Sequence, residues 1–362
     1  MHKGTVCFFN STKAWGGGEK WHYDISTRLS KKKYAVILAA QKKGELYKRL
    51  RKKGMKVVPF NISNLSFLNP IKIFSLVRFF KKYQIRAVIL NLPADLKAAG
   101  TAAKIAGVPK IIYRRGSAIP IKNSTLNRWL FKHVITAVIT NSEMTKHTIL
   151  ANNSDLFPKN KIHVIYNGIN LKKFDKREQK SLYEKKEQEI ILGTAGRFAA
   201  QKNHHFLVDL AHELKKRNLF FKILLAGTGK LESEIKNRTI KENVYENFVF
   251  FGFQKNIKSF MCSIDLFLLP SLWEGFGYVI VEAMACHKPV IAFNTSSNPE
   301  IIVNRNNGIL TPVNDIKAFA DAIEKLYGNN KEISLLGNNA REWVEKKFDI
   351  STTVVEVEQV LG

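Results

Sequence analysis

Residues 270–285 read Pro-Ser-Leu-Trp-Glu-Gly-Phe-Gly-Tyr-Val-Ile-Val-Glu-Ala-Met-Ala, and this stretch is the most informative in the chain. It follows the apolar run 266–269 and precedes a second apolar run at 289–292, so the predicted order is strand, loop, helix, strand. Glu274 falls in the loop and Glu282 in the helix. In a parallel sheet, such a unit places both carboxylates at the carboxyl edge of the strands, where open α/β proteins bind ligands. The alternative is that the two acids only cap the helix.

The rest of the chain alternates between strand-like and helix-like segments, which predicts an α/β fold with parallel sheets and helices on both faces. The alternation dissolves between residues 169 and 189 and then restarts. We therefore predict two doubly wound, Rossmann-like domains that face a cleft, an N-terminal domain over 1–168 and a C-terminal domain over 169–348. The last segment, 349–362, is too short for a unit of its own and is expected to pack back towards the N-terminal domain.

Positive charge is unevenly distributed along the chain, whose formal net charge is +28. Residues 1–172 hold 32 Lys and Arg against 6 Asp and Glu, whereas residues 173–362 hold 26 against 24. Nearly all of the excess therefore lies in the first half, which predicts that this half faces an anionic substrate or surface. The alternative is a lysine-rich surface that serves only solubility.

Composition also narrows the cellular location. No segment reaches the roughly 18 uninterrupted apolar residues of a membrane span, and the N-terminus lacks the charged-then-apolar pattern of a signal peptide. The three cysteines, Cys7, Cys262 and Cys286, are interpreted as small buried side chains in a reducing compartment. His204 and His205 would point to different sides of a helix, so no metal site is expected. These features predict a cytoplasmic protein.

The context and spacing of Glu274 and Glu282 resemble the signature of glycosyltransferase family 4. Five further motifs match that family in order and interval: Gly16-Gly17-Gly18-Glu19, Val164-Ile165-Tyr166-Asn167-Gly168-Ile169, Gly196-Arg197-Phe198 with Lys202, Ala226-Gly227-Thr228-Gly229, and Gly308-Ile309-Leu310-Thr311-Pro312. The resemblance covers almost the whole chain. It implies the GT-B fold and a retaining transferase that uses a nucleotide-sugar donor and needs no cofactor.

Arg197 and Lys202 correspond, by this resemblance, to the pair that holds the phosphates of the donor. Negative charge builds on the diphosphate as the sugar leaves, and without a metal it must be met by fixed cations and backbone N–H groups. Arginine can grip two phosphate oxygens in a fork, while lysine supplies a point charge. We predict both as catalytic residues. The alternative is a pair of solvated loop cations.

The remaining donor contacts are assigned by the resemblance to the second half of the chain. Glu282 is expected to accept hydrogen bonds from the ribose hydroxyls. Glu274, also predicted as catalytic, is expected to contact the transferred sugar, because a carboxylate only accepts hydrogen bonds and hydroxyls donate them. The other predicted donor-binding residues in this half are Gly227, Gly275, Phe276 and Gly277.

Three glycines, Gly16, Gly17 and Gly18, stand where the first predicted strand hands over to a helix. Their N–H groups are predicted to cradle a phosphate of the donor or acceptor. The alternative is a flexible turn.

Two positions in the first half depart from the commonest pattern of the family. Where many members carry a His that touches the donor sugar, this chain has Asn91-Leu92-Pro93-Ala94-Asp95, and Asp95 is the catalytic candidate for that role. The competing interpretation of Asp95 is a helix N-cap. Arg114 and Arg115 end the next predicted strand, which suggests an acceptor that bears phosphate or carboxylate groups.

Two segments mix large apolar residues with cations at helical spacing, 70–82 and, more briefly, 127–132. Either is predicted to lie in the headgroup plane of an anionic membrane leaflet. The alternative is an ordinary helix with its phenylalanines in the core and its cations in water.

These observations lead to one expectation and two rivals. We expect a metal-independent glycosyltransferase, peripheral on the inner face of the cytoplasmic membrane, whose acceptor is a lipid-linked or cell-envelope glycan such as lipopolysaccharide core or a surface polysaccharide. A nucleotide-sugar 2-epimerase of the same fold would need extra acid/base residues, and no such cluster stands out in the sequence. A basic nucleic-acid-binding protein is permitted by the charge, but no RNA- or DNA-binding motif is present, so nucleic acid is not an expected partner.

Overall fold

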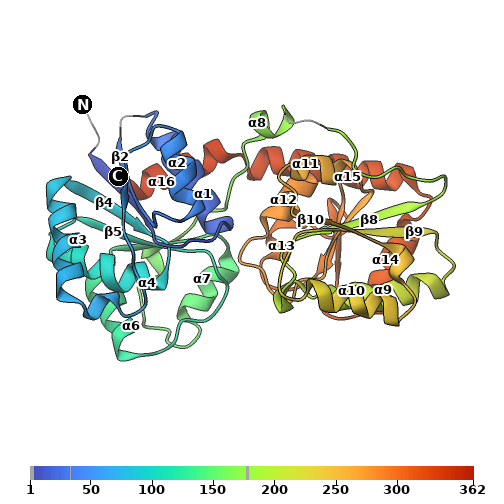
Figure 1. The fold of residues 1–362 in the computed structure, drawn as a ribbon, viewed down its shortest axis with the longest axis horizontal. Coiled ribbons are helices and arrows are strands. Elements are labelled where there is room, and N and C mark those ends of the chain that lie inside the picture. The colour runs from blue at the N-terminus through green and yellow to red at the C-terminus, as the bar shows by residue number, and fades with distance from the viewer. Residues whose placement is uncertain (1–3, 33, 177–178) are drawn as a thin grey trace. The chain divides into compact units, whose positions relative to one another are not determined.

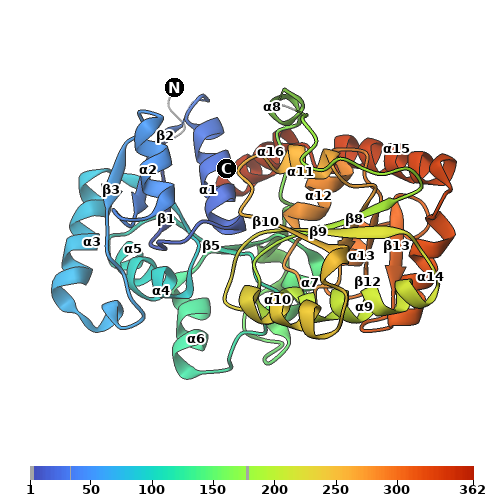
Figure 2. The ribbon, with the colours of Figure 1, turned by 45° about the vertical axis from the view of Figure 1, so that its right-hand side comes forward.

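The structure, a computed structural model, describes residues 4–32, 34–176 and 179–362. The chain divides into two compact units, Met1–Asn167 with Thr353–Gly362, and Gly168–Thr352. Each unit contains one parallel sheet with helices on both faces, as Figures 1 and 2 show. The predicted α/β class is confirmed. Arg177 and Glu178, in the charged stretch between the predicted domains, lie outside the described residues.

The first unit is built on a seven-stranded sheet in the order β3-β2-β1-β4-β5-β6-β7. Its strands are β1 Thr5–Asn10, β2 Ala35–Ala40, β3 Val57–Pro59, β4 Ile85–Leu90, β5 Lys110–Arg115, β6 Ala137–Thr140 and β7 Ile162–Val164. Its helices are α1 Gly17–Leu29, α2 Glu45–Lys52, the 3₁₀-helix η1 Ser66–Leu68, α3 Pro70–Lys82, α4 Pro93–Asp95, η2 Leu96–Gly100, α5 Thr101–Ile105, α6 Thr125–Trp129, η3 Leu130–Val134, α7 Glu143–Leu150 and the 3₁₀-helix η4 Lys159–Lys161. Figure 1 shows α1 and α2 on one face of this sheet, with α3, α4 and α7 on the other.

The second unit is built on a six-stranded sheet in the order β10-β9-β8-β11-β12-β13. Its strands are β8 Ile190–Ala195, β9 Phe221–Ala226, β10 Phe248–Gly252, β11 Leu266–Leu269, β12 Val290–Phe293 and β13 Gly308–Thr311. Its helices are α8 Leu171–Asp175, η5 Ala200–Lys202, α9 His204–Lys216, α10 Glu232–Lys241, η6 Tyr245–Asn247, α11 Ile257–Cys262, α12 Tyr278–Met284, α13 Asn298–Ile301, α14 Ile316–Leu326 and α15 Asn330–Lys347. The last helix of the chain, α16 Ile350–Leu361, starts in this unit.

The central strands are buried from end to end, which is why they read as continuous apolar runs. All six residues of β8 are buried, as are five of the six in β1. Strands covered by helices on both faces have no solvated side and therefore need no polar alternation. Large aromatic side chains fill the space between sheet and helices, such as Phe80 in the first unit and Phe293 in the second.

Both sheets reverse their winding at one point, and these points locate the sites. The order reverses between β1 and β4 in the first sheet and between β8 and β11 in the second. In doubly wound sheets, ligands bind outside the carboxyl ends of the strands at this switch, because the two connecting loops diverge there and leave a crevice. The loops that follow these four strands therefore carry the candidate sites.

The C-terminal residues belong to the first unit. Thr353–Gly362 cluster with residues 1–167, and the Lys110 ammonium at the start of β5 donates a 2.6 Å hydrogen bond to the Leu361 carbonyl. Thr353 also donates through its hydroxyl to the Tyr166 carbonyl at 3.0 Å. The end of the chain is thus held by hydrogen bonds to two segments of that unit.

Candidate donor and acceptor sites

In the second unit, the loops after β8 and β9 pack backbone against backbone. The Gly196 N–H donates to the Ala226 carbonyl at 2.9 Å, and the Phe198 N–H donates to the Thr228 carbonyl at 3.1 Å. Gly227 has φ +139°, and a Cβ there would overlap the Gly196 carbonyl oxygen. Only glycine fits this position. The predicted donor-binding Gly227 therefore sets the path of the loop that carries Arg197.

Lys202 and Glu274 form an ion pair at the switch point. Lys202 ends η5 after β8, Glu274 lies in the loop after β11, and the Lys202 Nζ lies 2.5 Å from Glu274 Oε1. The two side chains are 17 % and 8 % exposed, so the pair is shielded from bulk water but not sealed from it. Two predicted catalytic residues that lie 72 positions apart in the sequence are brought into contact.

Backbone hydrogen bonds hold this loop in place. The Leu272 N–H donates to the Gln201 carbonyl at 2.9 Å, and the Gln201 side-chain amide donates to the Trp273 carbonyl at 2.7 Å. From the other side, the hydroxyls of Ser296 and Ser297 donate to the Glu274 carbonyl at 2.7 and 3.1 Å. The carboxylate of Glu274 is thereby fixed on a rigid segment rather than on a mobile one.

The turn from this loop into α12 uses the second signature glycine. Gly277 has φ +78° and is the N-cap of α12, a conformation that a side chain rarely adopts. Phe276 is buried with its ring edge-on to Phe348 at 5.5 Å. Glu282 lies within α12 and is half-buried. Phe276 thus anchors the turn in the core, while the backbone on either side is free of a Cβ at Gly275 and Gly277.

Arg197 lies two residues after the end of β8 and is exposed. Among the described residues, no side chain forms an ion pair or a hydrogen bond with its guanidinium. It shares a loop with Lys202, whose charge is met by Glu274. The switch point thus carries one paired cation and one whose donors face solvent, a combination suited to an anionic ligand.

One buried histidine beside this site was not singled out from the sequence. His204 begins α9, stacks on Phe198 with ring centroids 4.3 Å apart, and has its pKa lowered to about 4 by burial and by the nearby charge of Lys202. At neutral pH it is uncharged and behaves as an aromatic support under the loop. The sequence indicated only that His204 was a poor metal ligand. Its role under the loop was missed because its stacking partner, Phe198, lies six residues away in a loop.

In the first unit, a buried polar network lies at the switch between β1 and β4. Glu19, in the first turn of α1, accepts hydrogen bonds through Oε1 from Asn10 at 2.9 Å and from Asn91 at 3.3 Å. Gly18 leaves room for the Asn91 side chain, because a Cβ there would lie 2.7 Å from its nitrogen and Asn91 would have to shift. The exposed Gly16 and Gly17 precede these residues at the helix start. Gly18 thus packs against the network, while the phosphate-binding role of the triplet stays a prediction.

Arg114 joins this network from the end of β5. It is 3 % exposed and donates to Asn167 at 3.0 Å and to Asn91 at 3.4 Å, with its guanidinium 5.2 Å from the centre of the Trp21 ring. Arg115 is half-buried and donates to the Tyr113 hydroxyl at 3.4 Å and to the Ile119 carbonyl. The two arginines therefore differ: Arg114 braces the network, whereas Arg115 orders the loop that follows it.

Asp95 is fully buried beside the same switch. Its carboxylate accepts from the Ser11 hydroxyl at 2.5 Å, from the Ser11 N–H at 3.2 Å and from the Leu92 N–H at 3.3 Å. Burial raises the pKa of Asp95 to about 7, against the lowering effect of these hydrogen bonds. Asp95 lies in the first turn of α4 and Leu92 is the N-cap of that helix, so the hydrogen bond from the Leu92 N–H to the Asp95 carboxylate caps the start of α4. Asp95 ties the β1 loop to the start of α4.

The asparagines of this network were not predicted as site residues. Asn10 ends β1, Asn91 directly follows β4, and Asn167 lies beyond β7. Asparagine at the carboxyl end of two strands that flank a switch point is the signal that was available. Asn167 could not be paired with Arg114 from the sequence, since 53 residues separate them.

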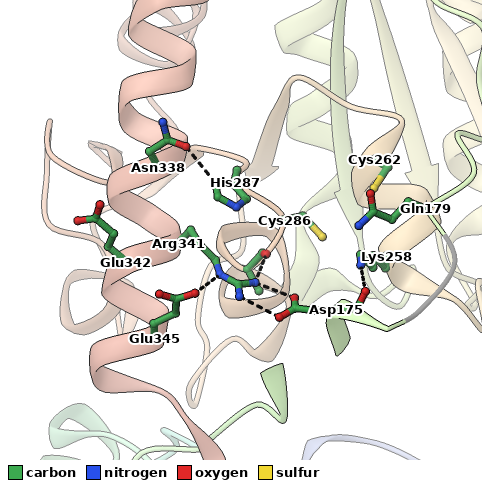
Figure 3. A pocket seen from close by; sticks show the side chains of 11 residues that line it. Asp175, Gln179, Lys258, Cys262, Cys286, His287, Asn338, Arg341, Glu342 and Glu345 are labelled. Atoms are coloured by element: carbon green, nitrogen blue, oxygen red, sulfur yellow. Dashed lines mark hydrogen bonds and ion pairs between the residues drawn. The ribbon is translucent and has the colours of Figure 1, made fainter. Parts of the chain in front are cut away.

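A separate pocket of about 560 Å³ lies in the second unit among α8, α11 and α15 (Figure 3). Arg341 on α15 donates to both carboxylate oxygens of Asp175 at 2.8 and 2.9 Å and to Glu345 at 2.7 Å. Cys262 and Cys286 are half-buried and line the pocket, so the interpretation of the cysteines as small buried side chains holds for Cys7 and only in part for these two. In the described chain, the pocket lining includes none of the residues predicted for donor binding.

Metal clusters and membrane-spanning helices are both absent from residues 4–32, 34–176 and 179–362. No three His, Cys, Asp or Glu side chains of these ranges are grouped so that they could hold a metal ion. Among the same residues, no helix has both the length and the apolar character required to cross a bilayer.

Comparison with known proteins assigns the chain to a family. The model described as Glycosyltransferase Family 4 matches residues 15–173, and the model described as Glycosyl transferases group 1 matches residues 175–343. An uncharacterized glycosyltransferase of Methanocaldococcus jannaschii is 32 % identical over 258 residues, which are 70 % of this chain and 68 % of that relative. The chain belongs to the family 4 glycosyltransferases.

This glycosyltransferase has one further informative relative and one informative match among solved structures. An Escherichia coli enzyme named UDP-Gal:alpha-D-GlcNAc-diphosphoundecaprenol alpha-1,3-galactosyltransferase is 26 % identical over 321 residues, 84 % of this chain and 82 % of that one. The crystal structure of Anabaena HepE in complex with UDP and glucose matches 99 % of both chains with a TM-score of 0.83 at 20 % identity. A match at this identity bears on the fold, and the predicted GT-B class of two Rossmann-like domains is confirmed.

Proposed function

We propose that this glycosyltransferase moves a sugar, with retention of anomeric configuration and without a metal ion, from a nucleotide-sugar donor to a lipid-linked or cell-envelope glycan. The observation that carries the proposal is the shielded Lys202–Glu274 pair next to the exposed Arg197. All three lie on the loops that follow β8 and β11, at the switch point of the second sheet. This is the place where a doubly wound sheet binds a nucleotide.

The chemistry follows from where charge develops. As the bond between sugar and diphosphate breaks, negative charge grows on the phosphate oxygens, and cations already fixed nearby stabilise it without reorganising. Arg197 has unshared donors for this purpose, and Lys202 is held in position by Glu274. Glu274 then serves as a hydrogen-bond acceptor for hydroxyls of the transferred sugar, and Glu282 as an acceptor for those of the ribose.

Retention places the acceptor hydroxyl on the face from which the diphosphate departs. A phosphate oxygen of the donor is then close enough to take the hydroxyl proton, so Glu274 is not required as a nucleophile. Its pairing with Lys202 fits this role, because an ion-paired carboxylate is a weaker nucleophile than a free one. Glu274 and Glu282 come from one loop-helix segment, which differs from the two flanking carboxylates of glycoside hydrolysis.

The acceptor side of the proposal rests on the first unit and on the relatives. The E. coli relative, by its name, acts on a sugar linked to diphosphoundecaprenol. The excess positive charge of residues 1–172 suits an acceptor that carries phosphate groups and lies at an anionic membrane surface. We therefore place the enzyme at the inner face of the cytoplasmic membrane, with Arg115 and the glycine turn at residues 16–18 as candidate acceptor and phosphate contacts.

The experiment is a transfer assay with a panel of nucleotide sugars, with and without undecaprenyl-linked glycan acceptors, in buffer that contains EDTA. Arg197→Ala and Lys202→Ala are each expected to lower turnover by about 10²–10³-fold, the scale of losing one charge-stabilising donor. The exposed Lys241→Ala, on α10, is the matched control. Turnover within threefold of the parent in both variants would contradict the assignment, as would conversion of the nucleotide sugar to an epimer without any acceptor.

A further inference from the structure

Four large apolar side chains of the first unit are exposed to solvent and lie close together in the sequence. The exposed fractions are 70 % for Leu65, 66 % for Leu68, 79 % for Ile71 and 68 % for Phe74. Leu65 directly precedes η1, Leu68 ends it, and Ile71 and Phe74 lie on the first turns of α3. We call these four residues the apolar tip. Singly scattered apolar residues are normal on a protein surface, but a contiguous group marks an interaction site.

The tip rests on a rigid base. The Asn69 side chain caps α3 by accepting from the Lys72 N–H at 3.0 Å, and the Lys72 ammonium bridges to the Ser66 hydroxyl of η1 at 3.2 Å. The opposite face of α3 is anchored in the core through Leu76, Phe79 and Phe80. The apolar tip is therefore presented by a packed helix rather than exposed through fraying.

Positive charge continues the same exposed face. Arg78, Lys81 and Lys82 are exposed on the later turns of α3. Residues 46–94 contain eleven Lys and Arg and no Asp or Glu. The next acid, Asp95, is fully buried, and no further acid follows before Glu143. The surface around α3 thus combines a local apolar group with a strong excess of cations.

We propose that the apolar tip inserts into an anionic lipid bilayer while Arg78, Lys81 and Lys82 contact the headgroups. An interfacial helix buries its apolar side about 5–10 Å into the boundary between headgroups and acyl chains. Eleven residues separate Ile71 from Lys82, a rise of about 16 Å along the helix. A tilted α3 can therefore hold its first turns at the acyl boundary and its last turns among the phosphates.

Charge complementarity selects the bilayer over other occupants. A protein partner that covered only the tip would leave the cations unused, and a nucleic acid would use the cations and leave Phe74 in water. An anionic leaflet satisfies both halves of the surface at once. Figures 1 and 2 both show α3 at the outer edge of the first unit, on the face of the sheet opposite α1 and α2.

The structure also separates the two segments predicted for membrane contact. In α3 the phenylalanines divide, with Phe79 and Phe80 in the core and Phe74 outside. In the segment 127–132, Leu130 and Phe131 are buried and only Trp129 among the large apolar residues is substantially exposed, at 43 %. Leu65 and Leu68 precede both segments and were not predicted. The inference rests on the proposed function only in assuming that the acceptor lies in a membrane.

The test is cosedimentation of the full chain with unilamellar vesicles of phosphatidylglycerol and phosphatidylcholine in equal parts, compared with pure phosphatidylcholine. Ile71→Ser/Phe74→Ser is expected to lower the partition coefficient by about 100-fold, since each side chain contributes roughly tenfold when buried. Arg78→Gln/Lys81→Gln/Lys82→Gln is expected to lower it by a similar factor on anionic vesicles only, at about fivefold per cation. The control, Ile240→Ser in the second unit, removes a side chain that is 57 % exposed and is expected to change nothing.

A single reporter separates insertion from surface adsorption. The indole introduced by Phe74→Trp, measured as the difference in emission from the parent with its five tryptophans, is expected to shift to the blue on anionic vesicles and to be quenched by lipids brominated in the acyl chain. Binding that survives Ile71→Ser/Phe74→Ser, or an indole emission that stays solvent-like in the reporter variant, would overturn the proposal. Tight RNA binding that depends on the three cations but not on the tip would do the same. Nucleoside diphosphate binding, measured in parallel, is expected to be unchanged in the tip variant, so failure of the insertion and failure of the transferase function give different results.

Discussion

Removal of the Lys202 ammonium is expected to destabilise the second unit as well as to weaken donor binding. Lys202 and Glu274 lie 2.5 Å apart with side chains 17 % and 8 % exposed, so Lys202→Ala leaves a mostly buried carboxylate without its counter-charge. Breaking a buried pair costs about 3–5 kcal/mol, and the residual exposure of Lys202 places the expected loss near the lower limit, about 3 kcal/mol. Glu274→Gln leaves the more exposed partner unpaired and is expected to cost less, about 1–2 kcal/mol.

The double variant Lys202→Met/Glu274→Gln separates the ion pair from the packing. Both replacements keep approximately the volume of the original side chain, so the variant is expected to unfold within about 1 kcal/mol of the parent. Denaturant unfolding followed by tryptophan fluorescence measures these differences, and Trp273 lies in the loop itself. In the cycle of the parent, Lys202→Met, Glu274→Gln and the double variant, a coupling free energy below about 0.5 kcal/mol would refute the pair. The double variant, although stable, is still expected to lose nucleoside diphosphate binding.

Three further outcomes are expected. Glu19→Ala removes the acceptor that Asn10 and Asn91 share and is expected to destabilise the first unit by about 2–4 kcal/mol in denaturant unfolding. Glu19→Gln keeps an acceptor oxygen and is expected to cost less than half of that amount. The pKa of Asp95 is raised from its ordinary 3.8 to about 7, so its contribution to stability is complete below pH 3.8 and is lost as the pH rises through 7. The free energies of unfolding of the parent and of Asp95→Asn, measured in denaturant from pH 4 to 8, are expected to diverge in favour of the variant by up to about 4 kcal/mol. A hydrogen bond from the Cys286 thiol, with help from Lys288 and Lys258, lowers the pKa of Cys262 to about 6, so iodoacetamide at pH 7 is expected to alkylate Cys262 before Cys286 or the buried Cys7, as peptide mass spectrometry would show.

The fold and the second half of the site could be predicted from the sequence for a physical reason. Buried parallel strands read as apolar runs, and the residues that follow them occupy the sheet edge by topology. Arg197 and Glu274 are placed at that edge because they lie in the loops that begin where β8 and β11 end. Gly227 and Gly277 were recognisable as glycines of a motif, and the structure shows that both have a positive φ, which favours glycine.

The first half of the site was harder to predict because its residues act through long-range pairing. Glu19 stood in the quoted glycine motif, but its partners Asn10 and Asn91 come from two different strands. A side chain such as Arg114 can point into the protein or out of it at the end of a strand, and the sequence alone does not fix which. Its burial follows from Trp21 and Asn167, which the fold brings around it.

Exposure on a helix is similarly decided by the neighbours of that helix. The segment 70–82 has apolar residues on more than one face, so its periodicity did not identify the side that packs. Phe79 is selected for the core by Phe60, whose ring lies 5.0 Å away, and Phe74 is left outside.

Calorimetric titration of nucleoside diphosphates into the full chain, in EDTA, tests the central claim most directly. If Arg197 and Lys202 neutralise the diphosphate, at least one of UDP, GDP or ADP binds without a metal, and each alanine variant weakens that binding by about 10–100-fold, the value of one charged hydrogen bond. The control Lys241→Ala leaves the affinity unchanged. Binding that appears only when magnesium is added, or that is equally tight in the parent and in both alanine variants, would contradict the account.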